Sequence, residues 1–132
     1  MKTKIPKTLL VYPVLIATWS AVFAAYSFLD GLGVYSSFGI DLACDPFALG
    51  NSAARYAGIA AALWVAILAL RSVDALILAM IARAVMDIGD TVTGLQTGIL
   101  PFESVWQPFV MFLGPEAYVL IRLFQLRRRD GA

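Results

Sequence analysis

The sequence contains no histidine and a single cysteine, Cys44, among its 132 residues. One cysteine cannot form a disulfide within the chain, so the cysteine content leaves the redox environment open. Imidazole and thiolate groups are the usual ligands of zinc and haem, and they also serve many hydrolases as base and nucleophile. The composition therefore excludes the usual zinc, haem and Cys/His catalytic arrangements, and we expect neither a metal nor a cofactor.

Charged residues are scarce as well: they make up 14% of the chain, whereas 61% of the residues are hydrophobic. The mean hydropathy of +0.81 is well above the range of soluble domains. The only dense basic run, Arg127 to Arg129, directly follows an apolar stretch, which is typical of a segment that meets lipid headgroups. The sequence therefore indicates a membrane protein whose main partner is the lipid bilayer, and it argues against nucleic-acid binding.

Four apolar stretches are long enough to cross a bilayer as helices. They span about residues 9–29, 53–70, 73–92 and 105–124. Roughly 20 helical residues, at ~1.5 Å each, cover the ~30 Å hydrocarbon core. The predicted fold is therefore an all-α, four-helix membrane bundle that forms a single domain over residues 1–132. In the fourth stretch, Gly114 and Pro115 should bend the helix or free a backbone carbonyl, which something inside the bundle must then satisfy.

The basic residues predict the direction of the spans. Eight of the ten lie before the first span, between the second and third, or at the end of the fourth: Lys2, Lys4, Lys7, Arg71, Arg122, Arg127, Arg128 and Arg129. Lys and Arg are enriched in the cytoplasmic segments of membrane proteins. We therefore expect both termini in the cytoplasm, at a bacterial inner membrane. The segment of about residues 30–52 carries acidic but no basic residues, and we expect it to lie on the membrane surface or cap the bundle.

A cleavable signal peptide is the competing interpretation of the first apolar stretch. Lysines precede this stretch, and Val22-Phe23-Ala24 resembles a cleavage site. However, the apolar run is longer than the roughly 7–15 residues that such peptides have. We therefore predict that the stretch is retained as a helix.

Apart from Asp74 and Arg122, which lie at the predicted cytoplasmic ends of their spans, five charged residues fall inside the predicted spans: Arg55, Arg83, Asp87, Asp90 and Glu116. Each costs roughly 2.5–3.5 kcal/mol at the centre of a membrane helix, so these residues should face the bundle interior and pair. Arg83, Asp87 and Asp90 are spaced i, i+4, i+7 and share one helix face. Depth along the alternating helices pairs Arg83 with Glu116 near the midplane. It pairs Arg55 with Asp87 or Asp90 further out. Arg83 and Asp87 could also pair within their own helix.

Aromatic residues form a stripe along the first span. Tyr12, Trp19 and Tyr26 recur every seven residues, and therefore face the same way. Tyr12 and Tyr26 are typical of the aromatic belts at membrane interfaces. Trp19 lies at mid-depth, so its indole N–H should find a partner inside the bundle, and Glu116 lies at the right height.

The charges inside the spans do not balance, because three carboxylates face two guanidinium groups. One acid among Asp87, Asp90 and Glu116 is therefore either protonated or paired with something outside the chain. A proton held there could be given to a substrate or carried across the membrane. The alternative is that all five charged residues only hold the helices together.

The second and third spans resemble a known group of proteins. Arg55 lies in the sequence SAARYAG near the start of the second span, and the third span carries Arg83, Asp87, Asp90 and Gly94. This pattern, which covers the middle of the chain, resembles the DoxX-like and related uncharacterised bacterial membrane proteins. The resemblance implies a four-helix membrane fold, and it implies no particular activity.

Three functions are compatible with this sequence. The first is a bundle that binds a small lipophilic molecule at the buried charges, with cofactor-independent acid–base catalysis of the isomerase, cyclase or hydrolase type. Its acids or bases would be Asp87, Asp90 and Glu116, and its ligand contacts Arg55, Arg83, Trp19 and Tyr26. The second is a proton-coupled transporter, which at this size would work as a homo-oligomer. The third is an accessory subunit of a membrane complex. We favour the first, because Ala75 to Ala82 of the third span offers no polar side chain for a path through the bundle.

Overall fold

The chain is helical over nearly all of the residues that the computed structural model describes, which are 4–31 and 46–130. The segment expected on the membrane surface falls mainly on residues 32–45, outside the described residues. The long helices are α1 (Lys7–Gly31), α3 (Pro46–Trp64), α4 (Val73–Gln96) and α6 (Gly114–Asp130). The shorter segments are η1 (Val65–Leu70), η2 (Phe102–Ser104), α5 (Trp106–Pro108) and η3 (Phe109–Leu113). The all-α fold is therefore confirmed.

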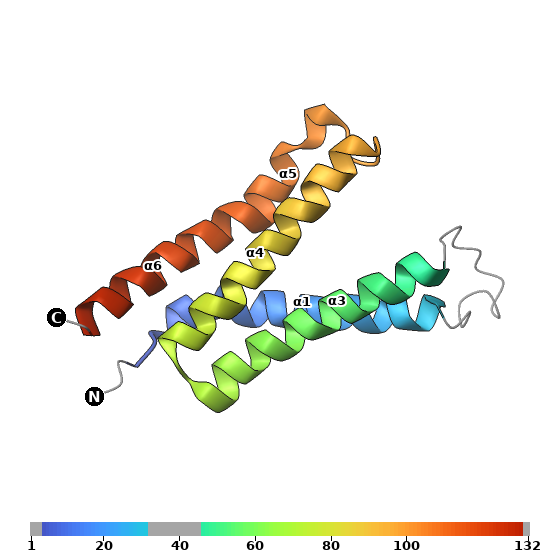
Figure 1. Ribbon diagram of the computed structural model, residues 1–132. Coiled ribbons are helices and arrows are strands. Elements are labelled where there is room, and N and C mark those ends of the chain that lie inside the picture. The colour runs from blue at the N-terminus through green and yellow to red at the C-terminus, as the bar shows by residue number, and fades with distance from the viewer. Residues whose placement is uncertain (1–3, 32–45, 131–132) are drawn as a thin grey trace.

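The helices form two hairpins that cross and then diverge (Figure 1). In the first hairpin α1 packs along α3, and in the second α4 packs against η3 and α6. The hairpins cross in the half of the molecule that holds both termini and the connection between η1 and α4, which we call the closed end. They separate toward the opposite end, where α1 ends and α3 begins, which we call the open end (Figure 1).

Buried apolar side chains fill the closed half. They come from all the long helices and form one cluster: Leu9, Ile16, Ala17, Leu63, Ala66, Leu76, Ile77, Ala79, Met80, Val119 and Leu123. Leu63, Leu76, Met80 and Leu123 have no exposed surface. Dispersion contacts of this kind stabilise packing even where lipid, and not water, surrounds the helices. The closed half is therefore a solid apolar seam between the hairpins.

A two-residue connection and one ion pair fix the closed end. Arg71 has a left-handed backbone (φ 46°), and its N–H donates to the carbonyl of Ala66 at 3.0 Å, which ends η1. The hydroxyl of Ser72 then caps the first turn of α4. In that turn Asp74 lies 2.8 Å from Arg127 of α6. The start of α4 and the end of α6 are thereby tied together.

Three helical segments are long and apolar enough to cross a membrane: Lys7–Asp30, Gly50–Leu70 and Phe102–Arg129. They contain the first, second and fourth predicted spans. The third predicted span lies in α4, which is equally long, but every 18-residue stretch of α4 includes Arg83, Asp87 and Asp90. Its charge, and not its length, sets α4 apart, and its crossing of the bilayer stays a prediction.

The last helix is loosened ahead of Pro115, as the sequence predicts. The backbone widens into the π-helical segment η3, in which the N–H of Gly114 donates to the carbonyl of Phe109, five residues earlier. A Cβ atom on Gly114 would lie only 2.8 Å from that carbonyl oxygen. The hydroxyl of Tyr12 donates to the carbonyl of Phe112 at 3.2 Å. A side chain of α1 therefore satisfies a carbonyl of the loosened turn from inside the bundle.

Candidate functional site

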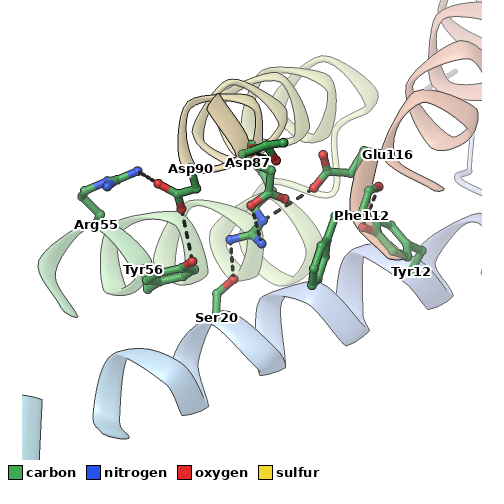
Figure 2. Close-up of polar contacts among 10 residues, drawn as sticks. Tyr12, Ser20, Arg55, Tyr56, Asp87, Asp90, Phe112 and Glu116 are labelled. Carbon is green, nitrogen blue, oxygen red and sulfur yellow. Dashed lines mark hydrogen bonds and ion pairs between the residues drawn. The ribbon is translucent and has the colours of Figure 1, made fainter. Parts of the chain in front are cut away.

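A buried guanidinium lies where the two hairpins cross. Arg83, in the middle of α4, is only 1% exposed. Its Nη2 lies 2.7 Å from Oδ1 of Asp87, one turn further along α4, and its Nε lies 3.5 Å from Oε1 of Glu116 in α6. Its Nη1 donates to the hydroxyl of Ser20 in α1 at 3.4 Å. Figure 2 shows Asp87, Glu116 and Ser20 turned toward the same region from three helices. One side chain therefore connects α4 with both α1 and α6.

Two aromatic rings also face this guanidinium. The Cζ atom of Arg83 lies 5.4 Å from the ring centre of Tyr56 in α3 and 5.9 Å from that of Phe112 in η3. These are cation–π distances, and a delocalised guanidinium is hydrated weakly enough to be held between rings. Polar and aromatic groups from every long helix or its extension thus surround Arg83.

A second ion pair lies further toward the open end. Nη2 of Arg55, in α3, is 2.7 Å from Oδ1 of Asp90 in α4. The hydroxyl of Tyr56 donates to the other oxygen of Asp90 at 3.3 Å. Figure 2 shows Asp90 between Arg55 and Tyr56. The side chains of Arg55 and Asp90 are 44% and 36% exposed, so this pair is far more accessible than the pair of Arg83 with Asp87. It connects the two hairpins on the open side of their crossing.

The buried charges are only partly satisfied. In the described part of the chain, Nε of Arg83, Oδ2 of Asp87 and both carboxyl oxygens of Glu116 are buried without a hydrogen-bond partner. The hydroxyl of Thr91, one turn beyond Asp87, donates to the backbone carbonyl of Asp87 and not to its carboxyl group. A buried acceptor without a donor costs about 1–3 kcal/mol. These three oxygens and Nε of Arg83 are therefore the chemically incomplete part of the site.

A cavity of about 280 Å³ lies between the hairpins beside these charges. Residues of all four long helices or their extensions line it: Trp19, Tyr56, Arg83, Asp87, Asp90, Thr91, Leu100, Gln107, Pro108, Met111 and Phe112. A larger groove of about 730 Å³ lies between α4 and the η3–α6 segment, but Thr91 is the only polar residue among the described residues that line it. The smaller cavity therefore combines an apolar wall with ionisable groups, and the groove does not.

The structure brings together most of the predicted site residues. The predicted pairs of Arg83 with Glu116, of Arg83 with Asp87 and of Arg55 with Asp90 are all confirmed. These pairs were predicted from helix periodicity and from the depth of each charged residue in its span. Both follow directly from the positions of the charges in the four spans. All five charged residues therefore belong to one polar cluster that runs from α6 to α3.

Two aromatic residues of α1, Trp19 and Tyr26, lie differently from the prediction. Trp19 is 54% exposed, and it lines the cavity instead of donating to Glu116. Tyr26 is 43% exposed; its ring lies 6.4 Å from that of Phe23, and it does not line the cavity. The face of α1 that packs inward carries small side chains instead: Ala17, Ser20, Ala24 and Ser27 are all buried. Small residues let two helices approach closely, which a stripe of aromatic rings would prevent.

Sequence reasoning missed two residues of the site, Ser20 and Tyr56. The signal for Ser20 was its place on the small-residue face of α1, which the aromatic stripe obscured. Tyr56 directly follows Arg55, and it bonds to Asp90 as Arg55 does, while its ring also faces Arg83. Over the ranges that the structure describes, no three acidic or cysteine side chains are grouped as ligands of a metal ion.

No family model, curated protein or solved structure matches the chain. The function is therefore inferred from the chemistry of the site itself.

Proposed function

We propose that the protein spans the bilayer with four helices, has both termini in the cytoplasm, and binds a small lipophilic molecule at the Arg/Asp/Glu cluster. The exposed surface of α4 supports its insertion beside the three more apolar helices. Arg83 and Asp87 are buried and Asp90 is paired. The side chains that α4 exposes include Leu78, Val85, Ile88 and Val92. A helix with its charges turned inward and apolar residues outside can lie in lipid.

The cavity between the hairpins is the observation that carries the binding proposal. Its volume of about 280 Å³ suits a small molecule, and such sites combine apolar walls with a few well-placed polar groups. Leu100, Met111 and Phe112 supply apolar surface, while Asp87 and Asp90 supply carboxyl groups. The cavity is also lined by Gln107 and Pro108 of α5, which lies toward the open end (Figure 1), so a molecule dissolved in the membrane would enter there.

The chemistry of the cavity supports acid–base catalysis of the isomerase, cyclase or hydrolase type. Asp87 and Asp90 both line the cavity, and Glu116 lies behind them next to Arg83. A carboxyl group within reach of a bound molecule can donate or remove a proton, and a fixed guanidinium can stabilise the negative charge that develops. Asp87 and Asp90 are therefore the proposed acid and base, with Arg83 as the electrostatic support.

The closed half favours a binding site over a transport path. A transporter needs its polar groups to be reachable from both sides of the membrane in turn. On the closed side of Arg83, Leu76, Met80 and Leu63 are packed without exposed surface, and no polar side chain of α4 lies between Ala75 and Ala82. The polar cluster therefore opens toward one end only.

Membership of the DoxX-like group stays a prediction, which rests on the residues around Arg55 and Arg83.

The orientation can be tested by labelling single cysteines in a Cys44→Ser background. Thr97→Cys, at the end of α4, should react with a membrane-impermeant maleimide in intact cells, because the positive-inside rule places the open end outside. Arg128→Cys, near the end of α6, should react only after lysis. Both positions are exposed, so a difference in labelling reports orientation and not burial. Labelling of Arg128→Cys in intact cells would contradict the proposed topology.

Ligand binding can be tested by filling the cavity. Met111 lines it, whereas the neighbouring Val110 is equally exposed and does not. Met111→Trp is expected to reduce the lipophilic molecules that copurify in nanodiscs by at least about tenfold, which corresponds to ~1.4 kcal/mol. The measurement is mass spectrometry of the organic extract, with Val110→Trp as the matched control. Equal recovery from both variants would show that the cavity does not hold these molecules.

A further inference from the structure

Two buried carboxyl groups share one guanidinium. Asp87 is 7% exposed and Glu116 is not exposed at all, and both form ion pairs with Arg83. Nη2 of Arg83 lies 2.7 Å from Oδ1 of Asp87, and Nε of the same guanidinium lies 3.5 Å from Oε1 of Glu116, so the two carboxyl groups meet at one cation. Oδ2 of Asp87 and both oxygens of Glu116 have no other donor among the residues that the structure describes. The unsatisfied oxygens of the site are therefore gathered in one carboxyl pair.

A hydrogen bond between two carboxyl groups requires a proton. An ionised carboxylate only accepts hydrogen bonds, whereas a protonated carboxyl group has one O–H to donate. Two ionised carboxylates beside each other in this buried position would also repel each other. One proton between them removes the repulsion and supplies a donor to one of the unsatisfied oxygens.

The balance of charge around Arg83 also indicates one proton. Arg55 pairs with Asp90, so Arg83 alone faces the two acids Asp87 and Glu116. Arg83, Asp87 and Glu116 together carry one negative charge if both acids are ionised, and they are neutral with one added proton. A neutral cluster is the state that a low-dielectric environment favours.

We propose that Asp87 and Glu116 form a proton-binding site, in which one proton is shared between Oδ2 of Asp87 and a carboxyl oxygen of Glu116. Arg83 pairs with the ionised member. The other titratable groups that face this pair are Tyr12 of α1, Tyr56 of α3 and Asp90 of α4. Arg83 is the only cation whose ion pairs reach either carboxyl group in the described part of the chain. The site therefore binds one proton and not two.

This proton can reach the cavity through Asp87. Asp87 lines the cavity, whereas Glu116 does not. If a basic atom of a bound molecule takes the proton, the O–H bond on Asp87 breaks and a bond from the proton to that atom forms. Both carboxyl groups are then ionised, and the pair regains a proton from the product or from water. This use of the proton rests on the proposed function, but the presence of the proton in the ligand-free protein does not.

Infrared spectroscopy of the ligand-free full chain in nanodiscs tests the proposal at neutral pH. The wild type should show the C=O stretching band of a protonated carboxyl group, shifted in deuterated water. Asp87→Asn and Glu116→Gln should each abolish this band, because the remaining carboxyl group then pairs with Arg83 in its ionised form. Asp90→Asn is the matched control, and it should keep the band.

Absence of the band from the folded wild type would overturn the proposal. So would a band that persists in both Asp87→Asn and Glu116→Gln, or one that is lost only in Asp90→Asn. If the variants do not fold, isotopic labelling of the wild type decides instead. The chain has only two glutamates, Glu103 and Glu116. A band that shifts with neither carboxyl-labelled glutamate nor carboxyl-labelled aspartate would refute the shared proton. Recovery of copurifying molecules from Met111→Trp is independent of this result.

Discussion

Replacing Arg83 with methionine is expected to destabilise the protein by about 3–5 kcal/mol, which is typical of breaking a buried ion pair on one side. The substitution keeps an unbranched stem like that of arginine but removes the guanidinium from Asp87, Glu116 and Ser20. Two buried carboxyl groups then face each other with no cation. The free energy of unfolding can be measured by titration with a denaturing detergent in mixed micelles, with helical circular dichroism as the signal.

Arg55→Met is the matched control for this prediction. Arg55 has the same charge and an equally short ion pair, but its side chain is 44% exposed, against 2% for that of Arg83. An accessible pair contributes about 0–1 kcal/mol, so Arg55→Met should cost that much or less. A variant that removes all three ionisable groups, Arg83→Met with Asp87→Leu and Glu116→Met, should recover much of the loss, since well-packed apolar groups can replace a buried ionic set. Equal losses for Arg55→Met and Arg83→Met would show that burial does not set the strength of this cluster.

Gly114→Ala is expected to destabilise the last helix by about 1–3 kcal/mol, the usual cost of forcing extra atoms into a packed site. The new Cβ would lie 2.8 Å from the carbonyl oxygen of Phe109, which belongs to the backbone and cannot rotate away as a side chain could. Gly114 also carries the N–H that closes η3 on this same carbonyl. The substitution should therefore disturb the π-helical turn itself, and the loss would appear in the same unfolding titration.

Gly89→Ala provides the comparison within a helix. Gly89 lies in α4, and nothing lies within 4 Å of the position that its Cβ would take. Alanine has the higher helix propensity, by about 0.8–1 kcal/mol, so this variant should be as stable as the wild type or more stable. If both alanine variants behave alike, close contact with the carbonyl of Phe109 is not the reason for glycine at position 114.

The charge pairs could be predicted from the sequence because lipid restricts where charges can go. Arg83 and Asp87 are one helical turn apart, and Glu116 lies at the same depth on an antiparallel helix. Few partners are therefore within reach of any buried ion. The loosened turn before Pro115 was also predictable, since proline has no N–H to continue the helix.

The faces of the helices and the angle between the hairpins were not predictable in the same way. The aromatic stripe of α1 suggested an inner wall, but the small residues around Ser20 form that wall because α3 packs closely against them. Apolar residues lie on all sides of a membrane helix, so hydrophobicity alone does not distinguish the lipid face from the packing face. The divergence of the hairpins depends on packing between all the helices, and the sequence of any one helix does not specify it.

The two-residue connection of Arg71 and Ser72, which joins η1 to α4, makes the closed end the natural pivot of the second hairpin. α4 has 24 residues, which at ~1.5 Å each give a lever of about 36 Å. A tilt of about 5° at the pivot would therefore shift the far end of such a lever by ~3 Å. The entrance to the cavity would then widen by ~3 Å while the apolar cluster of the closed half stays packed. A lipophilic molecule would therefore enter without disrupting that cluster.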